Sequence, residues 1–370
     1  SYDEEAVSQA VDQGLSLLGG PHQFVRPGET LLIKPNLLAG DAPEKSVTTH
    51  PAVFRAVCQA FLTAGATLSY GDSPAIGKTE RAAKKAGLAS VAEELGIPLA
   101  DFTTGVDLFF DKGIQNKRFT LAKAVLAHDG LISLPKLKTH GLEKFTGAVK
   151  NQFGCIPGVL KGEFHLKLPD ADQFAKMLVD LNRCISPRLY IMDGISAMEG
   201  NGPRGGTPRK MNVLLISDDP VALDATVCRM VHLNPEHVPT IRYGMQAGMG
   251  TFVESEIQLL GHDINAFYTE DFKIDRKPLP TSSRGIISGF VNQRLVSKPY
   301  ITADRCIRCG VCVDVCPVKP RALFFNDQDR SNPPMYNYDR CIRCLCCQEL
   351  CPESAIVLKT PLMRKLINRI

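Results

Sequence analysis

The chain has 370 residues, of which 44% are hydrophobic, and a formal net charge of +4. Its length suits two domains with a sizeable core, and its charge is too small to indicate a nucleic-acid partner. No apolar run approaches the roughly 18 residues of a transmembrane helix, and no signal-peptide segment follows Ser1. We therefore expect a cytoplasmic protein.

The first 280 residues alternate between two hydrophobic patterns. Helical spacing of apolar residues predicts helices over 2–18, 51–64, 80–95, 171–181 and 221–231, and short apolar runs predict strands over 30–33, 66–70, 130–134, 189–192 and 211–216. This alternation indicates an α/β domain over 1–280, with a core at about 28–250. We expect a mostly parallel sheet with helices on both faces.

Polar residues follow each predicted strand: Lys34 and Asn36, Asp72 and Ser73, Lys136 and Lys138, Asp193, and Asp218 and Asp219. Because ligands bind at the carboxyl ends of parallel strands, we expect these residues to converge on one rim. The alternative is that each strand end is polar because it meets solvent.

The stretch 136–154 is rich in cations, hydroxyl groups and glycines. It contains Lys136, Lys138, His140, Lys144, Thr146, Lys150 and Asn151, with Glu143 as its only acid. Such residues beside a strand end favour an anion site over a solvated basic loop. His165 joins His140 as an acid–base or metal candidate, and with Asp193 and Glu199 the pair leaves an additional metal ion at the rim open.

We therefore assign two groups of candidates in this domain. The catalytic candidates are Lys136, Lys138, His140 and Asp193, and the binding candidates are Lys34, Asn36, Lys150, Asn151, His165 and Glu199. No glycine-rich dinucleotide fingerprint follows the first predicted strand, and no G-x4-G-K-[ST] motif occurs. Nicotinamide, flavin and nucleotide sites of those kinds lack support.

The remaining residues contain a basic linker and a cysteine repeat. Residues 281–299 include three cations and no acid, which predicts a linker, and 359–370 predict a basic tail or helix that caps the domain rather than a membrane-surface anchor. Between them, residues 300–358 hold two runs of the form C-x2-C-x2-C-x3-C-P: Cys306, Cys309, Cys312 and Cys316, then Cys341, Cys344, Cys347 and Cys351.

This spacing is typical of two [4Fe–4S] clusters in bacterial ferredoxins, where the last cysteine of each run binds the other cluster. We assign Cys306, Cys309, Cys312 and Cys351 to one cluster, and Cys341, Cys344, Cys347 and Cys316 to the other. Paired C-x2-C also suits zinc, but two quartets that each precede a proline favour iron–sulfur clusters. The stretch resembles a small α+β ferredoxin-like domain, in which Cys346 is an extra residue.

The first domain also carries a resemblance. Its motifs include 33–37 (IKPNL), 134–140 (LPKLKTH), 146–154 (TGAVKNQFG), 192–195 (MDGI) and 219–224 (DPVALD), which are similar to those of the domain-of-unknown-function family 362. Members of that family often carry a ferredoxin module, as here. The resemblance implies a dedicated α/β domain and no established chemistry.

Two hypotheses of function follow. In the first, the chain is a reductase that passes single electrons from two [4Fe–4S] clusters to an anionic small molecule or cofactor at the rim, after an acidic ferredoxin or flavodoxin docks beside Arg305, Arg308, Arg340 and Arg343. In the second, it is a non-catalytic electron carrier or a maturation factor that serves a partner protein or a metal cofactor. The sequence leaves the oligomeric state open.

Overall fold

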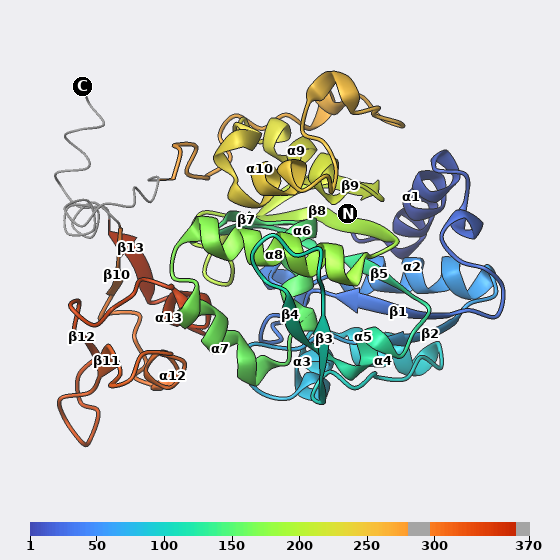
Figure 1. The fold of residues 1–370 in the computed structure, drawn as a ribbon. Coiled ribbons are helices and arrows are strands. Elements are labelled where there is room, and N and C mark those ends of the chain that lie inside the picture. The colour runs from blue at the N-terminus through green and yellow to red at the C-terminus, as the bar shows by residue number, and fades with distance from the viewer. Residues whose placement is uncertain (280–296, 360–370) are drawn as a thin grey trace.

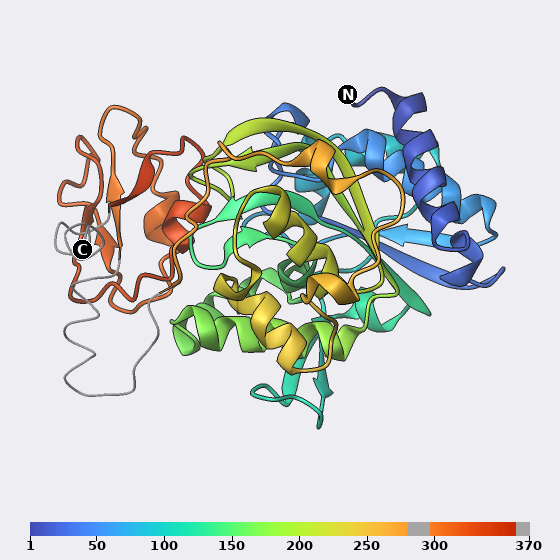
Figure 2. The same ribbon diagram turned by 90° about the horizontal axis from the view of Figure 1, so that it is seen from above.

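The computed structural model describes residues 1–279 and 297–359. The larger α/β part carries the small cysteine-rich part, which we call the module (residues 297–359), at one end of its sheet (Figures 1 and 2). Most of the predicted linker and nearly all of the predicted tail lie outside the described residues. Within the described ranges, no helix has the length and apolar character needed to cross a membrane.

The central sheet has seven strands in the order β2-β1-β5-β8-β6-β7, with β9 also paired to β8. Their bounds are β1 (Thr30–Pro35), β2 (Thr67–Tyr70), β5 (Gly130–Leu134), β6 (Lys136–His140), β7 (Lys144–Thr146), β8 (Leu189–Glu199) and β9 (Thr207–Ser217). All pairs are parallel except β6 with β7 and β8 with β9. The predicted mostly parallel α/β fold is confirmed.

Helices cover both faces of this sheet (Figure 1). One layer contains α1 (Glu4–Leu17), α2 (Pro51–Thr63), α3 (Thr79–Lys85) and α4 (Leu88–Glu94), and the other contains α6 (Ala148–Asn151), α8 (Ala171–Ile185), α9 (Pro220–Met230) and α10 (Pro239–Gln246). The side chains of Leu31 and Ile33 in β1 pack against the first layer of helices, and the side chain of Leu32 packs on the opposite face of the sheet. A strand buried on both faces is an unbroken apolar run, which is why the sequence reveals it.

Two predicted elements differ from the structure. The helix expected over 80–95 is broken into α3 and α4 at Gly87, whose φ of 75° is the left-handed conformation that favours glycine. A Cβ there would also lie 2.9 Å from the ring of Pro51. The strand expected to end at Met192 continues as β8 to Glu199, so Asp193 lies inside the strand.

The expected convergence of all the polar strand ends is wrong for Asp218 and Asp219. They follow β9, which runs antiparallel to β8, so its carboxyl end lies at the opposite edge from those of the parallel strands. Asp219 instead caps α9, where its side chain accepts hydrogen bonds from the backbone of Val221 and Ala222. Strand direction depends on the tertiary fold, and short apolar runs carry no signal of it.

Elements that the sequence did not reveal surround the sheet. They include the hairpin β3 (Gly105–Phe109) and β4 (Arg118–Ala122), the short helix α5 (Lys123–Leu126), and α7 (Gly158–Lys167). The sequence also did not reveal α6, α10, or the strands β6 and β7, so Lys136 and Lys138 lie within a strand and not after a strand end. The module contains β10 (Lys298–Ile301) paired with β13 (Ile356–Lys359), β11 (Leu323–Phe324) paired with β12 (Met335–Tyr336), and the short helices α12 (Val311–Asp314) and α13 (Cys346–Glu349). The two short helices occupy equivalent places in the cysteine repeat.

Asp224 fixes the helix that carries Lys150 and Asn151. Its buried carboxylate accepts hydrogen bonds from the backbone of Ala148 at 2.7 Å and Val149 at 3.2 Å. We expect Asp224→Ala to lower the free energy of unfolding by about 2–4 kcal/mol, because it leaves two buried N–H groups unpaired. Chemical denaturation measures this change. Asp12→Ala, which alters an exposed residue of α1, is the control, and an equal loss in both variants would contradict the assignment.

Candidate functional site

The eight cluster cysteines lie in two groups, and each group draws on both repeats. Cys306, Cys309, Cys312 and Cys351 line one small cavity. In the second group, burial raises the pKa of Cys341, and the neighbouring thiols of Cys344 and Cys316 raise it further. Burial also raises the pKa of Cys347, and the neighbouring thiols of Cys344 and Cys341 raise it further. Four converging thiols are the donor set of a [4Fe–4S] cluster, so both groups fit this cofactor with the crossed ligation.

The two groups differ in their access to solvent. In the first, Cys309 is exposed and Cys306 is half-buried, whereas Cys344, Cys347 and Cys316 of the second are buried. The second group lies beside α13, which packs on the α/β domain.

Three side chains join α13 and the residues after it to the α/β domain. Gln348 donates hydrogen bonds to the side chain of Asn201 at 3.0 Å and to the carbonyl of Gly202 at 2.9 Å. Arg204 donates to the carbonyl of Leu350 at 2.9 Å. The guanidinium of Arg204 is itself held by the buried carboxylate of Asp41 at 2.8 Å. The second group of cysteines is therefore the one that faces the α/β domain.

A cavity of about 490 Å³, which we call the junction cavity, lies between the module and the sheet rim. The α/β domain contributes the polar side chains of Asn36, Lys138, Lys150, Asn151, Lys161 and His165, and the module contributes Cys316, Cys346 and Glu349. One proposed cluster ligand and a group of cations thus share a single, partly open cavity. Five of these α/β residues are binding or catalytic candidates from the sequence.

The topology of the sheet explains why this cavity forms here. From β1 the chain proceeds to β2 on one side, whereas β5 lies on the other side of β1. The crevice at the carboxyl ends of two such strands is the usual ligand site of an open α/β sheet. The pairing of β1 with β5 stops at Pro35 and Leu134. The next strand along the chain, β6, pairs with β7 and β8 and not with β1. The sheet is therefore open beyond the ends of β1 and β5.

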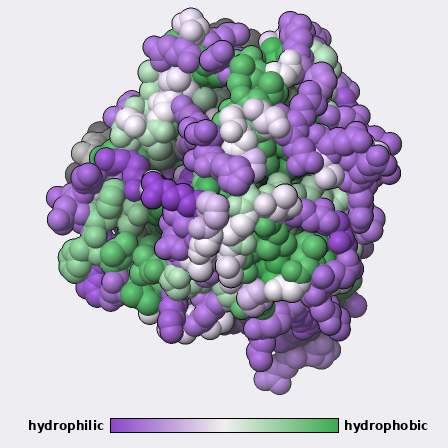
Figure 3. Space-filling view, turned by 90° about the vertical axis from the view of Figure 1, so that its right-hand side faces the viewer, coloured by the Kyte–Doolittle hydropathy of each residue, from purple (hydrophilic) through white to green (hydrophobic). Residues whose placement is uncertain are grey.

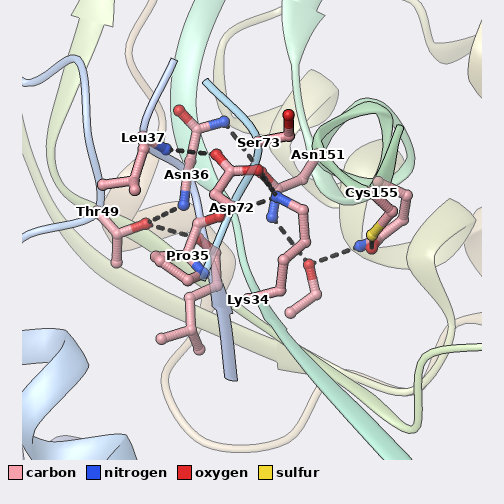
Figure 4. A network of polar contacts seen from close by, with 12 residues as sticks. Lys34, Pro35, Asn36, Leu37, Thr49, Asp72, Ser73, Asn151 and Cys155 are labelled. Carbon is pink, nitrogen blue, oxygen red and sulfur yellow. Dashed lines mark hydrogen bonds and ion pairs between the residues drawn. The ribbon is translucent and has the colours of Figure 1, made fainter. Parts of the chain in front are cut away.

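A buried hydrogen-bond network holds the cavity floor in place (Figure 4). Lys34 forms an ion pair with Asp72 at 2.9 Å, and its Nζ donates to Asn151 Oδ1 at 3.3 Å. Asn36 Nδ2 donates to the same Asn151 oxygen at 2.9 Å, while Asn36 Oδ1 accepts from Lys138 Nζ at 2.7 Å. Lys34 thus lies behind the cavity wall and positions the residues that line it.

The α/β domain supplies three of the four lysines that line this cavity, and the fourth is Lys319 of the module. Burial lowers the pKa of Lys138 to about 7 and that of Lys161 to about 8. Lys150 is half-buried, and its side chain has no hydrogen bond or ion pair with any residue in 1–279 or 297–359. An anion in the cavity would pair with these cations and favour their charged forms.

His140 and Glu349 form a buried contact between the two parts of the molecule, with 2.8 Å between Nε2 and Oε1. His140 Nδ1 accepts hydrogen bonds from the backbone of Leu142 and Glu143. Burial lowers the pKa of His140 to about 4, so the ring is neutral and carries its proton on Nε2, toward Glu349. His140 does not line the junction cavity.

His165 lines the cavity from α7 and is also neutral, because burial lowers its pKa to about 4. Its ring stacks on Phe174 at 4.5 Å and meets the edge of Phe153 at 5.7 Å between centroids. Its buried Nδ1 has no hydrogen-bond partner among the residues that the structure describes. A buried ring nitrogen of this kind is available to a bound molecule.

Three candidates lie elsewhere. Lys136 is buried against Asp193, with 2.7 Å between Nζ and Oδ2, and Tyr2 donates to Asp193 at 2.8 Å. Glu199 accepts from the backbone of Lys273 and pairs with its side chain. These charges are already paired, and none of the three candidates lines the junction cavity. In the described part of the α/β domain, no group of three His, Asp or Glu side chains is arranged to hold a metal ion, so the additional rim metal stays a prediction without a ligand set.

Sequence reasoning missed four charged residues of the cavity, namely Lys161, Asp314, Lys319 and Glu349. Lys161 had a local signal, because it precedes His165 by four residues and the two therefore share one face of a helix. Glu349 had none, because its pairing with His140 joins positions that are 209 residues apart. No pattern within either domain reports such a contact.

A second, larger cavity of about 630 Å³ lies between α1, β9 and α9. Its lining includes Leu17, Leu215, Ile216 and Leu260, and it contains no lysine, arginine or cysteine. Figure 3 shows the side of the molecule on which α1 lies, where hydrophobic patches interrupt a hydrophilic surface. This second cavity lacks the charge and the cysteines that make the junction cavity a candidate for electron transfer.

Comparisons with known proteins agree with both parts of the chain. Residues 31–229 match the domain of unknown function DUF362, and residues 298–353 match a 4Fe-4S dicluster domain. A thylakoid-associated protein of Synechocystis sp. is 38% identical over 250 residues, which make up 67% of this chain and 77% of that protein.

Two solved structures are similar to part of the fold. The lactate racemase apoprotein from Thermoanaerobacterium thermosaccharolyticum has a TM-score of 0.39 and 11% identity, over 59% of this chain and 54% of that one. A protein from Thermotoga maritima has a TM-score of 0.33 and 14% identity, over 58% of this chain and 54% of that one. The chain thus spans just over half of each, and likenesses this weak carry no functional argument.

Substitution of Cys316 tests the crossed ligation. We expect Cys316→Ser to lower the iron content of the anaerobically purified protein from about eight atoms per chain to about four, because one cluster loses a ligand. Iron analysis and the visible absorption spectrum measure this. Cys346→Ser is the matched control, because Cys346 lines the same cavity and should leave the iron content unchanged. Full iron content in Cys316→Ser would contradict the assignment.

The neutral histidines predict sensitivity to acid. His140 and His165 have folded pKa values of about 4, against an ordinary value of 6.5, so the unfolded chain binds protons first as the pH falls. Each should lower the unfolding free energy by up to about 1.4 kcal/mol per pH unit between those values. Thermal unfolding midpoints at pH 7.5 and 5.5 measure this.

A variant of one of these histidines separates their effect from general acid instability. His165→Asn should reduce the change in midpoint between the two pH values, whereas His22→Asn, which alters an exposed residue, should not. Equal pH dependence in the wild type and in His165→Asn would show that His165 is not buried as a neutral ring.

Proposed function

Since the chain belongs to the DUF362 family and carries a 4Fe-4S dicluster domain, we propose that it is an iron–sulfur reductase of an anionic molecule. Iron–sulfur electron transfer follows from the dicluster domain itself. The reductase role and the anionic substrate are our proposal. When bound, the two clusters supply single electrons to the site.

One observation carries the proposal. The junction cavity is lined on its module side by Cys316, the ligand that we assign to the second cluster, and on its sheet side by Lys138, Lys150 and Lys161. A molecule held by the lysines would therefore lie next to the cysteines that bind this cluster. A protein that only carried electrons to a partner would need no cationic cavity at this place.

Each cavity residue has a role in this proposal. Lys150 pairs with the anionic group, and the network of Asn36 and Asn151 holds Lys138 beside it. Because the cavity floor is buried, charged contacts there are stronger than in water. His165, with a free buried Nδ1 in the described part of the chain, exchanges a proton with the bound molecule. The contact between His140 and Glu349 keeps the module in place.

The electron donor docks at the other end of the module in this proposal. Cys309 is exposed there, and Arg305 and Arg308 are exposed beside it. These arginines suit an acidic donor such as a ferredoxin or flavodoxin. We place the reaction in an oxygen-free cytoplasm. The Synechocystis relative is described as thylakoid-associated.

Reoxidation kinetics test this function. The protein is reduced anaerobically and mixed with small carboxylates and phosphates that contain a reducible carbonyl group or double bond. We expect saturable reoxidation by at least one of them. Lys150→Ala should raise its half-saturating concentration by about ten- to a hundredfold, which corresponds to about 1.5–3 kcal/mol for a charged hydrogen bond. Stopped-flow absorption of the clusters measures the rate.

Lys84→Ala is the control for this experiment, because it removes an exposed lysine of α3. It should leave the kinetics unchanged. Rapid reoxidation by a partner protein, together with no saturable reoxidation by any anion, would contradict the reductase and favour the alternative of an electron carrier or maturation factor.

A further inference from the structure

The junction cavity has a charged floor and an apolar mouth. The floor residues Asn36, Lys138 and Asn151 are buried. The half-buried side chains of the lining are mostly apolar: Leu38, Ala75 and Ile76 from the α/β domain, and Val315 and Pro317 from the module. The exposed members of the lining are Asp314 and Lys319 of the module, which carry opposite charges. A molecule that reaches the floor passes them and then the apolar groups from both parts of the protein.

The charges at the floor leave a surplus of positive charge. Asp72 is paired with Lys34 at 2.9 Å, whereas Glu349 contacts the neutral ring of His140 at 2.8 Å and keeps its negative charge. The charges of Lys138, Lys150 and Lys161 exceed this single negative charge. No acid in 1–279 or 297–359 forms an ion pair with Lys138, Lys150 or Lys161. The floor thus suits the head of a ligand that carries negative charge, and not a neutral hydrocarbon.

The mouth suits a different part of the same ligand. A small anion such as acetate would fill little of a cavity of about 490 Å³ and would leave the apolar mouth in contact with water. Burial of a hydrocarbon chain there is favourable by about 0.8 kcal/mol per CH2 group. The volume and the apolar lining therefore point to a body attached to the anionic head.

We propose that the molecule bound in the junction cavity is an amphiphilic anion. Its carboxylate or phosphate head lies at Lys150 and Lys138, and its hydrocarbon body lies between Ile76 and Leu38 on one side and Val315 and Pro317 on the other. This inference rests on the proposed function and adds the class of ligand. It also implies that both parts of the chain hold the ligand, so neither part binds it alone.

Isothermal titration of the full, cluster-loaded chain tests this inference with acetate, butanoate, hexanoate and hexyl phosphate. We expect affinity to rise by about two- to fourfold per added CH2 group, so that hexanoate binds at least ten times more tightly than acetate. Hexylammonium, which has the same body and the opposite charge, should not bind. The binding of hexyl phosphate shows whether the site accepts any anionic head or only a carboxylate.

Two variants separate the head from the body. Ile76→Ser should weaken hexanoate three- to tenfold and leave acetate unchanged, and Ile114→Ser, which alters an exposed residue of another loop, should change neither. Lys150→Ala should weaken every anion in the series.

Each remaining outcome overturns a defined part of the account. Equal affinity for acetate and hexanoate would overturn the amphiphilic ligand and leave the anionic site of the proposed function intact. Tight binding of hexylammonium would mean that charge plays no part. No binding of any carboxylate or phosphate would overturn both the inference and the proposed function.

Discussion

The seating of α13 on the α/β domain is the contact on which this account depends. Glu349 meets the neutral ring of His140, Gln348 bonds to Asn201 and Gly202, and Arg204 holds the carbonyl of Leu350. These groups are buried, so each hydrogen bond must be satisfied in the folded molecule. Together they bring the second group of cysteines to the open end of the sheet and close the junction cavity from one side.

Two of the cations that line the cavity, Lys138 and Lys161, are buried. Burial of a lysine is unfavourable unless its charge is compensated, and the lowered pKa values of Lys138 and Lys161 reflect this cost. An anionic ligand removes the cost when it binds. The same lysines in open solvent would contribute little to the binding of an anion, because exposed ion pairs are weak and screened by salt. Their function therefore depends on the module that covers them.

Local patterns predicted the parts of the protein, and tertiary contacts determined how they work together. Unbroken apolar runs such as that of β1 revealed the parallel sheet, and the cysteine spacing revealed the module. Such patterns could not predict the direction of β9. They also could not predict that Lys136 is buried in an ion pair with Asp193, so that it is not available to bind an anion. The contact of Glu349 with His140 joins two domains, and the residue spacing within one domain cannot predict it.

The most direct test asks whether the bound anion lies beside the second cluster. Electron–nuclear double resonance on the reduced, cluster-loaded protein detects 13C-labelled hexanoate only if it is close to a paramagnetic cluster. The account predicts a 13C coupling that saturates with hexanoate and disappears in Cys316→Ser. The absence of any coupling at saturating hexanoate, or a coupling that persists unchanged in Cys316→Ser, would contradict it.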